Sequence, residues 1–127
     1  MELSIVTKYE ERVQSDLEVD EYIITIAGGR TAPTNWVMKL FPEISWLTKD
    51  NMPIVLVLTN QRVLVYKLHL DSEITLAMNV RREDIKDCIE ANGPLNGAIQ
   101  LTLKDSQTFK FVLKKDCVPE IVLELQE

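Results

Sequence analysis

His69 is the only histidine in the sequence, and Asp71 and Ser72 follow it closely. A histidine beside a hydroxyl and a carboxylate is the set of groups that nucleophilic catalysis uses, with the histidine as the base. These residues fall at a predicted strand end and turn, and no third group is in view to orient the imidazole. We therefore interpret His69 as a structural or surface residue.

Two acidic clusters could pair as general acid and base or bind calcium. Glu18, Asp20 and Glu21 form the first cluster, and Asp84 and Asp87 form the second. Neither has the spacing of a calcium-binding loop or of the paired carboxylates of a glycosidase. The pattern favours solvated surface charge in both places.

Glycine and cysteine residues give no stronger indication of chemistry. Gly28-Gly29-Arg30 follows a predicted strand, as a phosphate-binding loop would, but it lacks the later glycine and the Lys-Ser/Thr pair. Cys88 and Cys117 are too few and too far apart for a disulfide framework or a zinc motif, so we expect two reduced thiols in or near a core. The sequence thus predicts no catalytic residue, no metal site and no cofactor, and we do not expect an enzyme.

The residues from Arg30 to Met52 form a long connection that is rich in large apolar side chains. Tryptophan and phenylalanine anchor interfaces because they bury large areas. The segment either covers its own core or the N-terminal helix, or it contacts a partner protein or a lipid surface. The candidate contact residues are its aromatic groups and the lysines between them, namely Trp36, Lys39, Phe41, Trp46 and Lys49.

The basic residues of the first connection, Arg30, Lys39 and Lys49, are widely spaced, and with the pairs elsewhere they do not form the dense cluster that a phosphorylated headgroup needs. We interpret them as scattered surface charge; they include Arg30, Arg81, Arg82, Lys114 and Lys115. Arg62 either neutralises a nearby carboxylate or lies at the surface.

Composition narrows the choice of partner. The chain has 127 residues and a formal net charge of −6, which opposes non-specific attraction to nucleic acid or anionic lipid. No apolar run approaches the roughly 20 residues that a membrane-spanning helix needs, and charged residues interrupt any N-terminal signal segment. These features predict a cytoplasmic protein that does not bind nucleic acid.

The elements that would position these residues are organised around residues 53–70. Ile54 to Leu58 and Val63 to Leu70 are two apolar runs separated by Thr59-Asn60-Gln61-Arg62. Residues with β-branched side chains fit a pleated, packed surface, and asparagine tolerates tight turns. We predict two antiparallel strands joined at Asn60-Gln61, with the first strand buried on both faces.

Five further strands and two helices are predicted around this hairpin. The first strand is Tyr22 to Ile26, ended by Ala27-Gly28-Gly29. In the strand that begins at Ile85, Ile85 and Ile89 are expected on one face. The other strands are expected at 74–80, 99–103 and 109–113, a helix with an apolar stripe is expected at 3–17, and a second is expected after Asp116, which would cap it.

These elements predict a mainly β fold, a seven-stranded antiparallel barrel or sandwich capped by a C-terminal helix, with an extra N-terminal helix. This layout resembles the pleckstrin-homology (PH) superfold. Residues 57–65 resemble a Thr-Asn-x-Arg strand turn of bacterial PH-like domains, and residues 85–90 and 101–111 are similar to two later strand patterns. The position of Arg62 in this motif implies a structural role in the turn, which we favour. Ser106 stands where that family usually has glycine.

The resemblance covers about residues 20–127, the barrel and capping helix. We therefore expect one PH-like domain over residues 1–127, in which residues 1–19 are a helical extension that the family does not share. Because members of this family resemble lipid- and protein-binding modules, the resemblance also implies a non-catalytic binding or scaffold module. The net charge of −6 and the aromatic segment favour protein contact or self-association, through the aromatic groups or a strand edge. The alternative is a peripheral lipid-binding module that uses residues 30–52. A small enzyme has the weakest support.

Overall fold

The computed structural model describes residues 9–32, 52–93 and 96–126. Strands fill most of this range, because alternating or continuous runs of valine, isoleucine, leucine and phenylalanine suit a pleated, packed surface. Residues 9–14 are helical. The other elements are β1 (Ile23–Ala32), β2 (Pro53–Thr59), β3 (Arg62–Leu68), β4 (Ile74–Arg81), the 3-10 turn η2 (Arg82–Asp84), β5 (Ile85–Glu90), β6 (Gly97–Leu103), β7 (Thr108–Leu113) and α2 (Cys117–Leu125).

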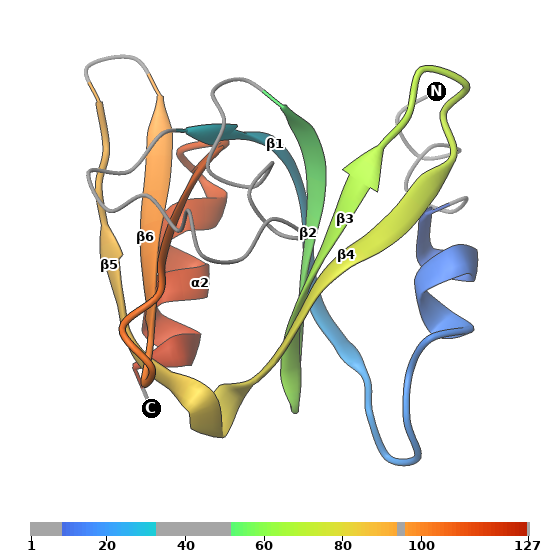
Figure 1. Cartoon of the computed structure of the whole chain (residues 1–127), viewed down its shortest axis with the longest axis horizontal. Helices are drawn as coiled ribbons and strands as arrows, with labels where there is room; N and C mark the ends of the chain where they lie inside the picture. The colour runs from blue at the N-terminus through green and yellow to red at the C-terminus, as the bar shows by residue number, and fades with distance from the viewer. Residues whose placement is uncertain (1–8, 33–51, 94–95, 127) are drawn as a thin grey trace.

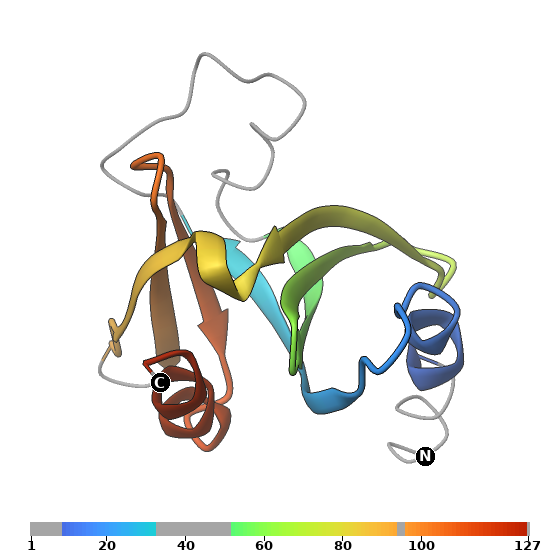
Figure 2. The same ribbon diagram turned by 90° about the horizontal axis from the view of Figure 1, so that it is seen from below.

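The seven strands form one antiparallel sheet in the order β4-β3-β2-β1-β7-β6-β5, so β4 and β5 are its edges. The sheet curls around its interior, and β4 and β5 meet through η2 (Figure 1). Seen at right angles, α2 lies beside β5, β6 and β7, while the helical residues 9–14 lie under β3 and β4 (Figure 2). The predicted fold class is confirmed: a mainly β, seven-stranded antiparallel sheet with a C-terminal and an N-terminal helix.

Two apolar clusters bury opposite faces of the central strands. The interior cluster takes side chains from all seven strands and from α2, including Leu56, Phe111 and Ile121. The outer cluster lies on the other face of β2, β3 and β4, and it consists of Val13, Val55, Val57, Leu64, Tyr66 and Ile74. Residues 54–59 are buried throughout, which confirms that the first strand of the hairpin is packed on both faces.

The glycine pair in β1 does not end the strand, contrary to the prediction. β1 continues through Gly28 and Gly29 to Ala32, pairing with β2 and β7. A Cβ atom on Gly29 would lie 2.2 Å from the carbonyl oxygen of Val112. The glycine therefore permits close approach of β1 to β7 instead of freeing the backbone.

The predicted sharing of one face by Ile85 and Ile89 is also wrong. The register of β5 against β6 shifts between Ile85 and Asp87, as a β-bulge does when one extra residue enters one strand. Ile85 packs against the interior, whereas Ile89 is 42% exposed. Cys88 takes the interior position that the unbroken alternation assigned to Ile89.

The C-terminal helix forms as predicted, with Val118, Ile121 and Val122 buried. Asp116 occupies the N-cap position, but its side chain makes no capping hydrogen bond. The predicted capping by this carboxylate is therefore wrong. Packing on the interior holds α2, as expected for a helix of nine residues.

Candidate functional site

The connection between β2 and β3 is closed by one side chain. The hydroxyl oxygen of Thr59 accepts hydrogen bonds from the backbone N–H groups of Gln61, at 3.1 Å, and Arg62, at 2.8 Å. A threonine hydroxyl that bonds the backbone two or three residues ahead stabilises a tight turn locally. The hydroxyl also lies 2.6 Å from Oε2 of Glu21 and can donate its proton there.

Arg62 and Glu21 form a buried, bidentate ion pair beside this turn. Arg62 donates from Nε to Oε2, at 2.9 Å, and from its terminal nitrogen to Oε1, at 2.6 Å. The side chains are 5% and 0% exposed. The hydrogen bond from Arg62 lowers the pKa of Glu21 to about 2, against the opposing effect of burial, while the pKa of Arg62 is raised by the same contact. Glu21, Thr59 and Arg62 are called the latch below.

The latch extends to the segment that precedes it. Arg62 donates to the backbone oxygen of Asp16 at 2.9 Å, and the hydroxyl of Tyr66 donates to the Asp16 carboxylate at 2.8 Å. The Glu18 carboxylate accepts two hydrogen bonds from Arg81, at 2.7 and 2.8 Å. The strand turn thus holds the chain that leads from the N-terminal helix into β1.

Asn60 and Gln61 fix the backbone of residues 18–22, called the pinned turn below. The backbone N–H of Tyr22 donates to the side-chain oxygen of Asn60 at 2.8 Å, and the Asn60 side-chain amide donates to the backbone carbonyl oxygen of Asp20 at 3.0 Å. Gln61 donates to the Val19 oxygen at 3.3 Å. Asp20 has φ of 63°, a left-handed conformation that costs free energy for a residue with a side chain.

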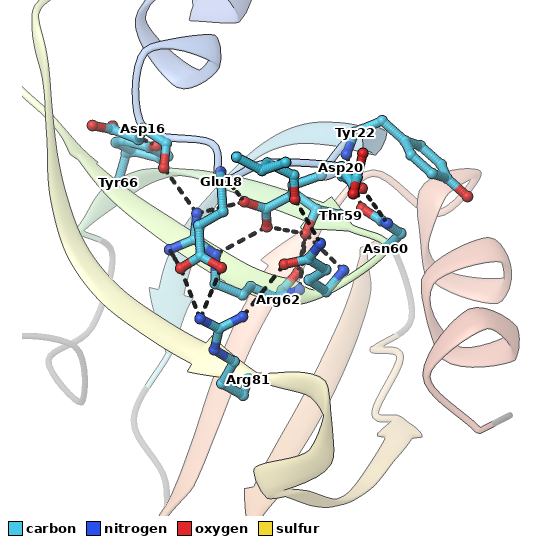
Figure 3. Close-up of polar contacts among 12 residues, drawn as sticks. Asp16, Glu18, Asp20, Tyr22, Thr59, Asn60, Arg62, Tyr66 and Arg81 are labelled. Carbon is cyan, nitrogen blue, oxygen red and sulfur yellow. Dashed lines mark hydrogen bonds and ion pairs between the residues drawn. The ribbon is translucent and has the colours of Figure 1, made fainter.

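The pinned turn directs two apolar side chains into solvent. Val19 is 86% exposed and Tyr22 is 61% exposed, and Figure 3 shows the Tyr22 ring pointing away from the latch. A pocket of about 640 Å³ beside the same strand turn is lined by Asn60, Gln61, Arg81, Arg82 and Glu83. Arg82 donates to the Glu124 backbone oxygen at 2.5 Å and so joins this end of the barrel to α2.

The predicted contact residues Trp36, Lys39, Phe41, Trp46 and Lys49 lie outside the described residues. The chain enters and leaves that segment at Thr31 and Met52. Thr31 N–H donates to the Met52 oxygen at 2.9 Å, and Met52 N–H donates to the Thr31 hydroxyl at 2.9 Å. The start and end of the segment are therefore tied together where β1 ends and β2 begins.

His69 and Asp71 line one pocket together with Glu73 and Thr75, but their side chains bond different partners. The Nε2 atom of His69 lies 2.8 Å from the Thr75 hydroxyl, while the Asp71 carboxylate accepts from the Glu73 backbone at 3.0 Å. Cys88 is buried and Cys117 half-buried, both as free thiols, as predicted; burial raises the pKa of Cys88 to about 12. Within the described ranges, no three or more histidine, cysteine or acidic side chains are placed to hold a metal ion.

Some of the acidic residues predicted to be solvated are exposed, and one is buried. Asp84 and Asp87 are exposed, as predicted, and Asp20 is exposed as well. Glu21 is buried in the latch, so its interpretation as solvated charge is wrong. Its burial is possible because Arg62 and Thr59 supply three hydrogen bonds to the carboxylate. The structural role favoured for Arg62 is confirmed.

Sequence reasoning missed Val19 and Tyr22 as surface residues. Tyr22 fits the start of a strand of apolar residues, and Val19 sits in an acidic junction without periodicity. The available signal was the Thr-Asn-x-Arg turn, whose side chains had to bond some neighbouring backbone. Nothing in the local pattern indicated that this backbone was residues 18–22.

The chain matches no family model and no curated protein. Among solved structures it is similar to the C-terminal domain of an unknown protein from Leishmania infantum, with a TM-score of 0.64, 10% identity, and coverage of 96% of this chain and 99% of that one. It is also similar to the hSac2 domain from human phosphoinositide phosphatase Sac2, with a TM-score of 0.61, 13% identity, and coverage of 96% and 79%. At these identities the likeness establishes the fold alone.

Proposed function

We propose that this chain is a non-catalytic binding or scaffold module of the PH-like kind that acts by protein contact. The observation that carries the proposal is the pinned turn, which presents Val19 and Tyr22 to solvent from a fixed backbone. A binding surface that is already ordered loses little conformational entropy when a partner docks. Tyrosine is also enriched among the residues that dominate interface energies.

A non-enzymatic role is favoured by the way the charged side chains around the latch are used. Glu21 and Arg62 satisfy each other inside the fold, and Arg81 is paired with Glu18. A catalytic carboxylate needs a pKa near the working pH and access to substrate, whereas Glu21 has a pKa of about 2 and a buried side chain. Glu21, the carboxylate with the strongly lowered pKa, therefore has a structural role.

The first experiment compares retention of proteins from the native cell by immobilised wild-type chain and by Tyr22→Ala and Val19→Ala variants. Leu70→Ala is the matched control, since Leu70 is fully exposed at the β3–β4 hairpin, far from the pinned turn. We expect a specific partner to be lost with Tyr22→Ala and kept with Leu70→Ala. Equal retention by all four proteins would contradict the assignment of this surface.

Self-association is the second form of the proposal, through the segment that contains Trp36, Phe41 and Trp46 or through a sheet edge. Both edges carry features that discourage pairing, because the register of β4 and of β5 shifts and β5 is charged. The aromatic segment is thus the favoured route of the two. Light scattering of wild type and of a Trp36→Ala/Trp46→Ala variant at high concentration tests self-association. A strict monomer in both proteins would refute this form of the proposal.

The alternative proposal is a cytoplasmic peripheral membrane module. It is favoured by two cations beside the start of the aromatic segment: Arg30 pairs with Val112 and Ala32 with Lys110, so Arg30 and Lys110 are diagonal neighbours on one face. One structural neighbour is a domain of a phosphoinositide phosphatase. No described helix is long and apolar enough to cross a bilayer. Sedimentation with anionic vesicles at low salt tests this alternative. If the chain does not bind the vesicles, the membrane proposal is refuted.

A further inference from the structure

The first half of β1 is an unpaired strand edge. β2 pairs with β1 from Ile23 to Arg30, whereas β7 pairs with it only from Gly29 to Ala32. The stretch Ile23–Gly28, called the open edge below, therefore has no described strand on its second side. In the described part of the chain α2 packs chiefly on β5 and β6, so the helix does not take the place of the missing strand.

The backbone of the open edge directs hydrogen-bonding groups to that second side. The Thr31 N–H bonds to the Met52 oxygen on the β2 side, and the backbone groups of an antiparallel strand alternate between its two neighbours. The register from Thr25 onward is unbroken, so Ile26 and Gly28 direct their N–H and C=O groups away from β2. A Cβ atom on Gly28 would meet nothing within 4 Å, so the sheet face at that residue is uncovered.

The composition of the open edge leaves it able to pair. Its sequence has neither a charged residue nor a proline, two features that commonly protect a strand edge from pairing. The edge strand β5, in contrast, carries Lys86, Asp87 and Glu90. An extended peptide can add to an unprotected edge through main-chain hydrogen bonds, and the side chains that flank the edge then select the peptide.

Exposed apolar side chains flank the Tyr22 end of the open edge. Tyr22 directly precedes Ile23 and is 61% exposed in the pinned turn. On α2, Glu120 accepts a hydrogen bond from the Thr25 hydroxyl at 3.0 Å, and Leu123, one helical turn further on, is 65% exposed. Apolar contacts are thus available to a peptide at this end.

Cations flank the Gly28 end. Arg30 lies two positions beyond Gly28, and the exposed Lys114 follows Leu113, which pairs with Gly29. Among the described residues neither cation forms an ion pair, whereas every other arginine does, namely Arg12, Arg62, Arg81 and Arg82. In a chain of net charge −6, two such cations favour an acidic group in the ligand at this end.

We propose that the open edge docks an extended segment of a partner protein, which adds as a strand antiparallel to β1 and in line with β7. The segment places an acidic residue beside Arg30 and Lys114, and β-branched or aromatic residues towards Tyr22. The inference rests on the proposed function, since the open edge continues from the pinned turn, and it names the class of partner. Main-chain bonding to Ile26 and Gly28 favours a peptide over a lipid, and the net charge of −6 on each copy opposes pairing of two copies.

The first test selects short random peptides displayed on phage against immobilised wild-type chain, and the most enriched peptide is synthesised with a fluorophore. We expect an acidic residue near its N-terminus, followed by alternating β-branched or aromatic residues. Its affinity should fall about tenfold or more in Arg30→Glu/Lys114→Glu. An absence of enrichment, or an affinity that does not change in this variant, would overturn the proposal.

The second test removes one N–H group from the open edge with Gly28→Pro, and Gly28→Ala is the matched variant that retains it. This N–H points away from β2, so proline removes no bond between β1 and β2. The selected peptide should bind Gly28→Pro about tenfold more weakly than Gly28→Ala. Equal binding by the two variants would refute strand addition.

Hydrogen exchange of the wild-type chain gives a measurement that does not depend on how well Gly28→Pro folds. The Ile26 and Gly28 amides should exchange about tenfold more slowly when the selected peptide is bound. The Ala27 and Gly29 amides point towards β2 and serve as the internal reference. Rates at Ile26 and Gly28 that do not change relative to this reference would overturn the proposal.

The outcomes separate this inference from the proposed function. Peptide binding that is lost in Gly28→Pro but kept in Tyr22→Ala would support the open edge and contradict the pinned turn as a contact surface. A cellular partner that is lost in Tyr22→Ala but kept in Gly28→Pro would refute the open edge and support the pinned turn. Binding of both Gly28 variants to anionic vesicles without any selected peptide would refute the inference in favour of the membrane alternative, and a dimer lost only in Gly28→Pro would refute it in favour of pairing between copies.

Discussion

Glu21 and Arg62 lie 41 residues apart in the chain and meet as a buried ion pair with two hydrogen bonds, of 2.6 and 2.9 Å. This pair joins the start of the barrel to its central hairpin. It also lies beside the pinned turn, so the proposed binding surface at Val19 and Tyr22 depends on the same region of contacts.

Removing one member of the pair should destabilise the fold strongly. Arg62→Met leaves the Glu21 carboxylate buried without its partner, and we expect a loss of about 3–5 kcal/mol in unfolding free energy. Glu21→Leu combined with Arg62→Met should recover most of this loss, because no charge remains buried. Arg81→Met is the control: its pair with Glu18 is about 42% exposed and should cost less than about 1 kcal/mol. Urea denaturation measures all four proteins, and a Glu21→Leu/Arg62→Met chain no more stable than Arg62→Met would contradict this account.

Stability should fall in acid because of Glu21. Its pKa is lowered from 4.5 to about 2 in the folded chain, so its contribution is complete above pH 4.5 and is lost as the pH falls through 2. The linkage amounts to roughly 3 kcal/mol. Urea unfolding at pH 6, 4 and 2.5 should show a steeper decline for wild type than for Glu21→Gln, and parallel curves would exclude Glu21 as the source.

Gly29 should not tolerate a side chain, although the neighbouring glycine should. A Cβ atom at Gly29 would lie 2.2 Å from the Val112 oxygen and 2.6 Å from Leu113 Cδ2, whereas one at Gly28 would meet nothing within 4 Å. We expect Gly29→Ala to cost about 1–3 kcal/mol through strain between β1 and β7. Gly28→Ala, measured in the same thermal melts, should stay within about 0.5 kcal/mol of wild type.

Ser106→Gly should stabilise the β6–β7 hairpin. Ser106 has φ of 79°, in the left-handed region where a side chain costs about 1–2 kcal/mol and glycine costs little. The substitution should therefore raise the unfolding free energy by roughly 1 kcal/mol. Ser106→Ala keeps the Cβ atom and should give no such gain, so equal effects of the two changes would show that φ is not the cause.

Local patterns predicted the hairpin of β2 and β3, the later strands and the apolar stripe of α2. They failed at β1 and β5, where Gly29 and the bulge between Ile85 and Asp87 respond to neighbouring strands. They also failed at Glu21, which appears in the sequence as one of several exposed acids. The aromatic contact residues Trp36 and Trp46 remain a prediction, because they lie outside the described residues.

Alternation of side chains and turn residues was sufficient to specify the elements, since each depends on groups a few positions away. The Thr-Asn-x-Arg turn could be predicted from the sequence because its residues also depend on near neighbours in the chain. The partner of Arg62, the exposure of Tyr22 and the burial of Val13 on the outer face were decided only when the sheet curled and brought distant segments together. A contact across 41 residues depends on the path of the whole barrel, and no local spacing records it.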